Sequence, residues 1–292
     1  MATPAQWLEG ARPRTLPAAV SPVLAGTGVA AYVDRAVWWK AALALVVALA
    51  LQVGVNYAND YSDGIRGTDA DRVGPLRLVG SGAASARSVR LAAFAAFGVA
   101  VVAGLVLAAT TSWWLVPVGA LAVLAAWFYT GGSMPYGYRA LGEVMVFLFF
   151  GLVAVLGTTY VQTRSLPLPA WYAAVGVGVL ACGILVANNL RDIPTDRAAG
   201  KATLAVVLGE ERSRYLYVLL VAAAAVALVA LVLTTSRLAL LGAAFVVPAV
   251  PAARMVLAGV TGRDLVPVLA RTGLAELLWA AGVLLGLLVA SL

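Results

Sequence analysis

Two short clusters of asparagine and aspartate are the part of this sequence best suited to chemistry. Their members are Asn59, Asp60, Asp63, Asn188, Asp192 and Asp196. The pattern Asn-x-x-x-Asp occurs in both clusters, and residues four apart on a helix share one face. Carboxylate and amide oxygens are hard ligands that suit Mg²⁺, with Mn²⁺ as a substitute, and such a metal bridges to phosphate oxygens. The clusters therefore predict a divalent-metal site for a phosphorylated ligand.

Each cluster stands at the exit of a hydrophobic segment that must position it. The first follows the apolar run 38–55, and the second follows the run 171–187. Runs of this length cross a bilayer as helices, and a carboxylate at mid-membrane costs about 2.5–3.5 kcal/mol. Aspartates at such an edge are retained chiefly where they act or meet water. One cluster alone is also consistent with a hydrated acidic loop, whereas two clusters of the same pattern favour a shared site.

The composition indicates an all-α polytopic membrane protein. Of the 292 residues, 63% are hydrophobic and 11% are charged, and the mean hydropathy is +0.96. We expect one intramembrane domain over residues 1–292, without a signal peptide. The single cysteine, Cys182, lies in an apolar run, so no disulfide framework is expected. The chain has no histidine, which excludes metal sites and general-base chemistry that depend on this residue.

Nine apolar segments predict nine transmembrane helices. They span residues 15–33, 38–57, 88–109, 112–128, 142–160, 170–188, 213–234, 238–257 and 274–292. If the N-terminus is cytoplasmic, 16 of the 20 Lys and Arg residues lie on that side, and the other four are Arg35, Lys40, Arg164 and Arg237. The positive-inside rule then places the internal loops 58–87 and 189–212, with both clusters, at the cytoplasmic face of the inner (plasma) membrane. All acidic residues except Asp34 are expected at the same face.

The net charge of +7 is explained by this topology. Positive charge at one membrane face also attracts anionic membrane lipid, so nucleic acid is not expected as a partner. A third cytoplasmic loop, residues 129–143, is rich in Gly, Pro and Tyr. Irregular backbone at a membrane edge is permitted where it lines a polar cavity, and a simple turn is the alternative for this loop alone. Glu143, at the end of the loop, is either a helix N-terminal charge that the dipole favours or a base.

A metal-bound diphosphate beside an apolar bundle points to a polyprenyl diphosphate as the substrate. Two Asp-rich segments at one face, with Arg and Lys between them, suit the diphosphate, and the bundle suits a long hydrocarbon. Metal binding draws charge off the diphosphate and makes it a better leaving group. The allylic cation that remains is a strong electrophile, which a dry cavity protects from water.

Four motifs in order make the chain resemble the UbiA-type superfamily of intramembrane aromatic prenyltransferases. They are Ala11-Arg12-Pro13-Arg14-Thr15-Leu16-Pro17, Asn59-Asp60-x-x-Asp63 with Gly67-Thr68-Asp69, Tyr129-Thr130-Gly131-Gly132 to Leu141-Gly142-Glu143, and Asn188-Asn189-x-Arg191-Asp192-x-x-x-Asp196 with Gly200-Lys201-x-Thr203-Leu204. The resemblance covers residues 11 to about 205. Many members have a further Asp where this chain has Gly67, and here the acid follows at Asp69 instead. In this variant the chain is similar to the branch that uses 1,4-dihydroxy-2-naphthoate.

The resemblance implies nine transmembrane helices around a central cavity and a role for each matched residue. The metal ligands that it implies are Asp63, Asp69, Asp192 and Asp196. The implied catalytic residues are Asp60, Asp63, Asp192, Asp196 and Lys201. Contacts with the diphosphate or the acceptor are implied for Asn59, Arg66, Asn188, Arg139, Tyr129, Tyr138, Arg191 and Arg12. Alternatively, the arginines are topology anchors and the tyrosines form an interfacial belt.

The reaction that the resemblance implies joins the polyprenyl group to 1,4-dihydroxy-2-naphthoate, an aromatic acid. Carbon dioxide and diphosphate leave, and demethylmenaquinol is formed in menaquinone biosynthesis. Attack at the carbon that bears the carboxylate restores aromaticity by expelling CO₂, so no strong protein base is expected. The alternatives are another acceptor, such as 4-hydroxybenzoate or homogentisate, and transport of an organic anion. A transporter would place its binding groups near the bilayer midplane, whereas the acids are expected at one face.

Overall fold

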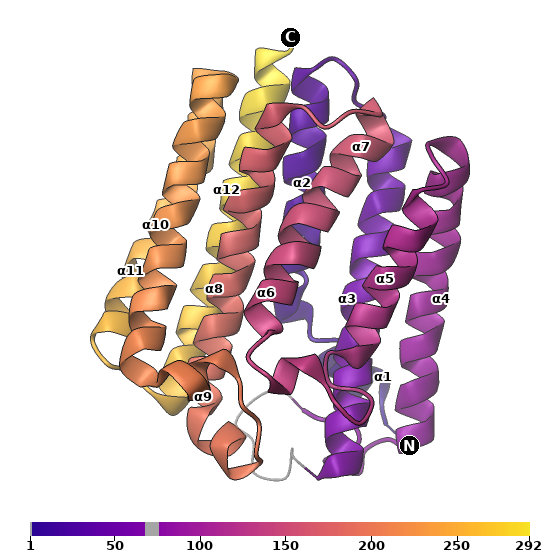
Figure 1. Ribbon diagram of the computed structural model, residues 1–292, viewed down its shortest axis with the longest axis vertical. Coiled ribbons are helices and arrows are strands. Elements are labelled where there is room, and N and C mark those ends of the chain that lie inside the picture. Colours follow the sequence, from indigo (N-terminus) through magenta and orange to yellow (C-terminus); the bar gives the residue numbers. More distant parts are fainter. Residues whose placement is uncertain (1, 68–75) are drawn as a thin grey trace.

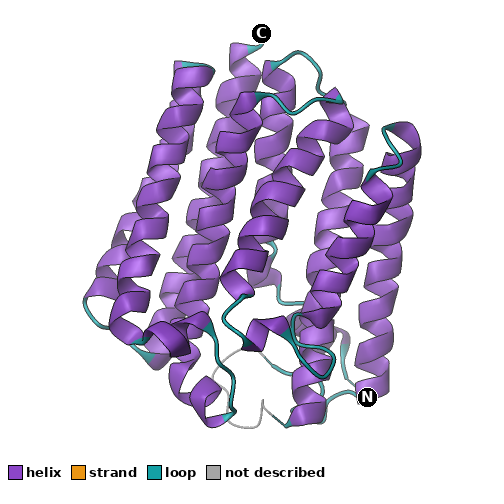
Figure 2. Cartoon of the chain, in the orientation of Figure 1, coloured by secondary structure: helices purple, strands orange, loops and turns teal. Residues whose placement is uncertain are grey.

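The apolar segments of the chain form helices that lie side by side along the length of the molecule (Figure 1). The computed structural model describes residues 2–67 and 76–292, and these residues contain no β-strand (Figure 2). The elements are α1 (Pro4–Gly10), η1 (Pro13–Thr15), α2 (Pro17–Tyr32), α3 (Trp38–Arg66), α4 (Ala86–Thr110), α5 (Leu115–Phe128), η2 (Tyr136–Tyr138), α6 (Gly142–Val146), η3 (Phe147–Leu156), α7 (Gly157–Thr163), α8 (Leu168–Ala198), α9 (Leu204–Leu208), α10 (Glu210–Thr234), η4 (Arg237–Phe245), α11 (Val246–Leu257), η5 (Gly262–Leu265) and α12 (Val266–Ala290).

Seven helical stretches of the described chain are long and apolar enough to cross a membrane. They are α3, α4, Gly142–Thr163, α8, α10, Arg237–Leu257 and Gly262–Ala290. The pair Pro4–Thr15 and Pro17–Tyr32, bent by 49°, would make an eighth span, and α5 is apolar but only 14 residues long. The all-helical membrane architecture is confirmed, and all nine predicted segments are helical. The count of nine spans is not confirmed, because two segments fall short of a single straight span.

The two termini lie at opposite ends of the bundle, the N-terminus beside α1 and the C-terminus at the far end of α12 (Figure 1). The helices also run further than the sequence predicted. Because α3 continues to Arg66 and α8 to Ala198, both Asn/Asp clusters lie on final helical turns, and the prediction that they lie in the loops 58–87 and 189–212 was wrong. Gly67 ends α3 with φ of 72°, a left-handed conformation that glycine adopts without steric cost. Gly67, at which the chain departs from the pattern of the resemblance, is therefore a helix cap.

Close contacts between helices fix α8 at the centre of the bundle. Trp279 of α12 is fully buried, lies against Gly176 of α8 and donates its Nε1–H to the carbonyl of Ala224 in α10 at 3.2 Å. On the other side of α8, a Cβ on Gly151 would lie 2.8 Å from the Cα of Gly178. This backbone contact falls within η3, a π-helical segment, a widened geometry that is frequent near functional sites. It sets the position of α6 and η3 against α8.

One acidic residue departs from the predicted concentration of acids at one end. Glu276 lies within the span Gly262–Ala290, its side chain is fully buried, and neither carboxylate oxygen has a hydrogen-bond partner among the described residues. The expectation that every acid except Asp34 lies at one membrane face was therefore wrong. The sequence pattern did not place Glu276 inside the membrane, because this residue stands near the start of the predicted apolar segment 274–292. At such a position only the packing of the helix decides how deep the side chain lies.

A candidate active site at one end of the bundle

The acids of the first cluster are buried on the last turns of α3. Asn59, Asp60 and Asp63 are at most 9% exposed. The two oxygens of Asp60 accept the backbone N–H groups of Leu78 at 2.7 Å and of Val79 at 3.0 Å, and the charge of Arg12 acts on the same carboxylate. Asp60 therefore holds the segment after residue 75 against α3. This contact gives Asp60 a structural task that the sequence did not predict.

Asp63 is the acid of α3 that makes contact with other predicted site residues. Its Oδ1 accepts the hydroxyl of Tyr138 and lies 3.4 Å from Nζ of Lys201. The ammonium group of Lys201 also lies 4.6 Å from the centre of the Tyr138 ring, within the range of a cation–π contact. Both Asp63 and Lys201 are less than 9% exposed. A buried carboxylate, a buried ammonium group and a phenol thus form one compact group.

The second cluster is held by its own arginine on α8. Arg191 donates from Nε and Nη2 to the two oxygens of Asp192, each at 2.7 Å, and from Nη2 to Oδ1 of Asn188 at 2.9 Å. The bidentate geometry is the strongest form of an Arg–carboxylate pair. One Asp196 oxygen accepts the Thr203 hydroxyl at 3.5 Å. Asp192 is 3% exposed and Asp196 is 7% exposed, so this cluster is as buried as the first.

Backbone bonds between two loops bring the clusters to the same end of the bundle. The N–H of Lys201 donates to the carbonyl of Asp196 at 2.8 Å, and the N–H of Ala202 donates to the carbonyl of Tyr138 at 3.1 Å. Arg139 and Ala202 form an isolated parallel β-bridge. Segment 138–139 therefore lies beside segment 201–202, and Lys201 reaches from the end of α8 to Asp63 on α3. The structure brings together both clusters, Lys201 and Tyr138, as the sequence predicted.

Arg66 ties the third loop to the end of α3. Its guanidinium group donates to the carbonyls of Thr130 and Gly132 and lies 5.7 Å from the centre of the Tyr138 ring. Thr130 in turn donates its hydroxyl to Oδ1 of Asn59 at 2.8 Å. The loop is therefore more than a simple turn, which was the alternative interpretation, because its backbone and side chains are both bonded to the site.

The other predicted residues of this loop lie at different depths. Tyr129 is half-buried, and its ring meets that of Tyr136 edge to face with 5.5 Å between the centres. Tyr136 donates its hydroxyl to the carbonyl of Ala125 at 2.7 Å, and burial raises the pKa of this phenol. Tyr136 therefore anchors the loop to α5. Arg139 is exposed, and Arg12 is half-buried with φ of 56° at the start of η1.

Among residues 2–67 and 76–292, no three Cys, Asp or Glu side chains lie close enough to bind one metal ion. Asp69, a predicted ligand, lies outside the described residues. The remaining donor set nevertheless fits Mg²⁺, since Asp63, Asp192 and Asp196 supply only oxygen atoms and are buried. In the structure the negative charge of Asp63 faces Lys201 and that of Asp192 faces Arg191. The acids are therefore balanced by protein cations here.

Asn189 has a place in the site but was missing from the predicted set, whereas Glu143 was left there as either a helix N-terminal charge or a base. Asn189, which follows the predicted residue Asn188, faces the third loop. Its Nδ2 donates to Oε1 of Glu143 at 2.9 Å. Both Asn189 and Glu143 are less than 9% exposed. Their sequence signal was present, because both belong to the motifs Asn188-Asn189 and Leu141-Gly142-Glu143. What the sequence did not reveal is that these motifs touch.

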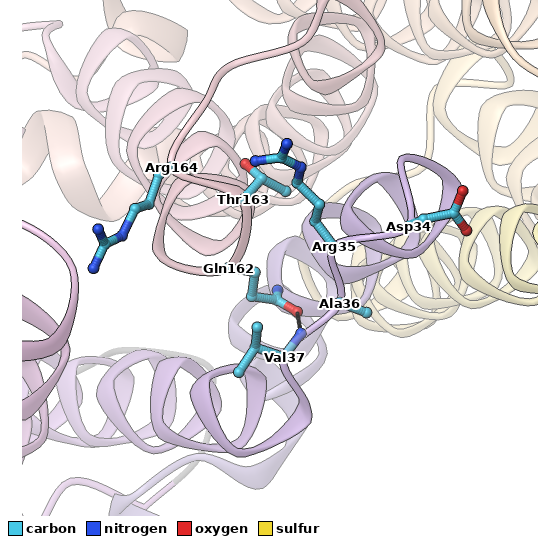
Figure 3. Close-up of a pocket in the computed structure, with 7 residues that line it drawn as sticks. All are labelled: Asp34, Arg35, Ala36, Val37, Gln162, Thr163 and Arg164. Carbon is cyan, nitrogen blue, oxygen red and sulfur yellow. Dashed lines mark hydrogen bonds between the residues drawn. The ribbon is translucent and has the colours of Figure 1, made fainter.

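The opposite end of the bundle has a cavity of about 430 Å³ between the loop before α3 and the end of α7. Its lining residues are Asp34, Arg35, Ala36, Val37, Gln162, Thr163 and Arg164 (Figure 3). Within it, the N–H of Val37 donates to Oε1 of Gln162 at 3.1 Å. None of the predicted site residues lines this cavity, so it is separate from the acidic end.

Comparison with known proteins gives close relatives over almost the whole chain. Residues 19–266 match the UbiA prenyltransferase family. The chain is 56% identical over 283 residues to a 1,4-dihydroxy-2-naphthoate octaprenyltransferase of Mycobacterium tuberculosis, covering 97% of each protein. It is 39% identical over 222 residues to the protein of the same name in Escherichia coli, covering 71% of this chain and 70% of that protein.

Solved structures share the fold at lower sequence identity. A UbiA homolog from Archaeoglobus fulgidus bound to DMAPP and Mg²⁺ has a TM-score of 0.70 at 16% identity, covering 97% of this chain and 99% of that chain. A UbiA homolog from Aeropyrum pernix K1 in its apo form has a TM-score of 0.73 at 18% identity, covering 92% of this chain and 97% of the other. The arrangement of helices is therefore common to these proteins.

Proposed function

This chain belongs to the UbiA prenyltransferase family, and on that premise we propose that it transfers a polyprenyl group from a polyprenyl diphosphate to 1,4-dihydroxy-2-naphthoate. The product would be demethylmenaquinol, an intermediate of menaquinone biosynthesis. The names of the relatives at 56% and 39% identity support this acceptor. The single observation that carries the proposal is the contact of Lys201 with Asp63, because Lys201 follows the second cluster and so brings together two clusters more than a hundred residues apart in the chain.

The diphosphate is proposed to bind between the two clusters with Mg²⁺. Asp63, Asp192 and Asp196 would hold the metal, and the same ion is bound in the UbiA homolog of Archaeoglobus fulgidus together with DMAPP. When bound, Mg²⁺ would neutralise the charge that develops on the leaving diphosphate. Lys201 and Arg191, which balance these acids in the structure, are positioned to turn toward the diphosphate oxygens.

The protein's own groups then protect and direct the allylic cation. The ring of Tyr138 contacts the cations of Lys201 and Arg66, and we propose that it also stabilises positive charge on the prenyl group. The apolar bundle above the clusters excludes water, which would otherwise capture the cation. Asn59 and Asn188, each bonded to a neighbour of the site, keep Thr130 and Arg191 in place.

At the acceptor, a C–C bond forms between C1 of the prenyl group and the ring carbon that bears the carboxylate, while the C1–O bond to diphosphate breaks. The bond from the ring to the carboxylate then breaks, CO₂ leaves, and its electron pair restores the aromatic ring. Arg12, Arg139 and Arg191 are the candidates to bind the acceptor carboxylate, and Tyr129 is a candidate to hold the ring. The charge of Arg12 already acts on Asp60, so this guanidinium group belongs to the same end of the bundle.

We further propose nine crossings of the cell's inner (plasma) membrane as a single domain over residues 1–292, with the N-terminus and the site at the cytoplasmic face. An odd number of crossings is supported by the termini, which lie at opposite ends (Figure 1). The excess of Lys and Arg at the acidic end supports the orientation. Cysteine labelling of a position in the loop at Asp34 and of one near Arg139, in intact cells, tests both statements.

Membranes that contain the protein, supplied with Mg²⁺, a polyprenyl diphosphate and 1,4-dihydroxy-2-naphthoate, are expected to release one CO₂ for each prenylated product. Mass spectrometry of the lipid extract detects the product, because a prenylated 4-hydroxybenzoate would retain its carboxylate. EDTA should abolish turnover, and Mg²⁺ or Mn²⁺ should restore it. Prenylation of 4-hydroxybenzoate or homogentisate with none of the naphthoate would overturn the acceptor, and full turnover in EDTA would overturn the metal.

A further inference from the structure

Glu143 is a buried carboxylate beside the site that the reaction as proposed above does not use. It is 8% exposed and opens α6. Its Oε1 is held by the amide of Asn189 at 2.9 Å, whereas its Oε2 is buried and has no hydrogen-bond partner in the described chain. A buried acceptor without a donor costs free energy, so its retention requires a task or a ligand. One oxygen of Glu143 is therefore fixed by the protein and the other is left for a donor that the described chain does not provide.

The position of Asn189 places this free oxygen next to the diphosphate site. Residues 189, 192 and 196 are spaced i, i+3 and i+7, so Asn189 lies on the same stripe of α8 as Asp192 and Asp196. Three residues of α-helix rise by about 4.5 Å, so Glu143 contacts this stripe one turn deeper in the bundle than Asp192. If the diphosphate binds at Asp192 and Asp196 as proposed, an aromatic acceptor would meet C1 of the donor at about this depth.

The groups around Glu143 do not neutralise it. The hydroxyl of Tyr129 would lie 3.7 Å from a Cβ on Gly142, so this aromatic residue stands beside α6. Sγ of Cys182 donates to the backbone carbonyl of Glu143 at 3.2 Å, which leaves the carboxylate unaffected. A neighbouring aromatic ring and a buried carboxylate oxygen without a donor suit an aromatic molecule that carries a hydroxyl group.

We propose that Oε2 of Glu143 accepts the hydroxyl proton of the aromatic acceptor during prenyl transfer, with Asn189 as the residue that positions it. The inference rests on the proposed function and adds a catalytic residue to it. Loss of the proton makes the ring electron-rich at the neighbouring carbon, which bears the carboxylate. The oxygen's electron pair moves into the ring as the new C–C bond forms and diphosphate leaves. When CO₂ departs, the electron pair returns to the oxygen, and Glu143 gives the same proton back, so no net proton is consumed.

The test compares Glu143→Gln with the wild-type protein in membranes. Glutamine keeps an oxygen for Asn189 but cannot take a proton, so kcat should fall roughly 100-fold. The KM for the polyprenyl diphosphate and its Mg²⁺-dependent binding should stay unchanged. Because a more acidic hydroxyl needs less help from a base, the defect should shrink with a ring-fluorinated naphthoate acceptor. Glu143→Asp, which keeps a carboxylate, should retain more activity than Glu143→Gln and serves if the glutamine variant does not accumulate.

Glu276→Gln is the control, since Glu276 is also a buried glutamate, with neither oxygen hydrogen-bonded in the described chain, but it lies on α12. Its effect on kcat should be small and independent of acceptor acidity. The proposal is overturned if Glu143→Gln retains wild-type kcat, if its defect is the same for both acceptors, or if Glu143→Asp is no more active than Glu143→Gln. Wild-type membranes that prenylate no naphthoate at all would instead overturn the proposed function, so the two failures are distinguishable.

Discussion

The two ends of the bundle both bury charge, but they satisfy it in different ways. At the acidic end, Asp63 is paired with Lys201 and Asp192 with Arg191. At the opposite end, Lys40 is 7% exposed and donates to three neutral oxygens, at 3.1 Å to the carbonyl of Thr110, 2.8 Å to the hydroxyl of Thr111 and 2.9 Å to the carbonyl of Val161. All three donors of the ammonium group are then used.

This difference separates a structural charge from an exchangeable one. A lysine with three fixed oxygen acceptors has nothing left to offer a ligand, and it serves to join α3, α4 and α7. The acids at the other end are paired with cationic side chains, and we expect metal binding to replace these pairs, so that the cations can then bond phosphate oxygens. The cavity of about 430 Å³ at the opposite end shows that volume alone does not identify the site, because Asp34, Arg35 and Arg164 line it but none of the predicted site residues does.

The largest effect on activity is expected from the loss of a single acid in either cluster. Asp63→Asn and Asp192→Asn should each lower prenyl transfer by roughly 1,000-fold, since several kcal/mol of charge stabilisation at the diphosphate depend on the metal that these acids hold. Radiolabelled donor and scintillation counting of the lipid product measure the loss. Asp34→Asn, at the opposite end, is the control and should keep wild-type activity. Asp192→Asn with most of its activity at saturating Mg²⁺ would refute a site built from both clusters.

A milder change separates charge from hydrogen bonding within the acidic end. Lys201→Met removes the ammonium group that faces Asp63 and should lower kcat/KM for the diphosphate by roughly 10–100-fold. Tyr138→Phe keeps the ring beside Lys201 but loses the hydroxyl that donates to Asp63, so a loss of only about 3–10-fold is expected. Initial rates over a series of donor concentrations give both values. Equal losses for the two variants would mean that Lys201 acts only through Tyr138.

At the opposite end the same kind of substitution should affect stability and leave chemistry intact. Lys40→Met removes three hydrogen bonds that link these helices and should lower the free energy of unfolding by about 3 kcal/mol. Thermal unfolding in detergent measures the loss, and prenyl transfer per folded molecule at a permissive temperature should match the wild type. If Lys40→Met were fully stable yet inactive, the assignment of the two ends would have to be reversed.

The parts of this arrangement that follow from local pattern could be predicted from the sequence. The Asn-x-x-x-Asp repeats, the apolar segments before them and Lys201 identified the acidic end and the family. The helix ends could not be placed, because polar residues on a buried face continued α3 to Arg66 and α8 to Ala198. The role of Asn189 was hidden for a related reason. It differs from Asn188 by about 100° around the helix axis, and only the packing of α6 against α8 decides which of the two meets Glu143.

The smallest effect is expected for Tyr136, which is two residues from Tyr138 in the same loop but faces a different partner. Tyr138 faces Asp63, whereas Tyr136 donates to the carbonyl of Ala125 and is structural. Tyr136→Phe should therefore cost about 1 kcal/mol of unfolding free energy at pH 7 and leave prenyl transfer unchanged.

The pH dependence gives this prediction its sharpest form. Burial raises the pKa of Tyr136, so the folded protein keeps the proton at a pH at which the unfolded chain, with its tyrosines titrating near pH 10, releases it. The stability that the neutral phenol contributes is complete below about pH 10 and is lost as the pH rises further, because ionisation then favours the unfolded chain. Tyr136→Phe lacks this term, and all other tyrosines are common to both proteins. The stability gap between wild type and variant, measured by unfolding at pH 7 and near pH 11, should therefore narrow at the higher pH. A gap that stays constant over this range would mean that Tyr136 ionises as freely in the folded protein as in the unfolded chain, and that its bond to Ala125 does not hold the loop.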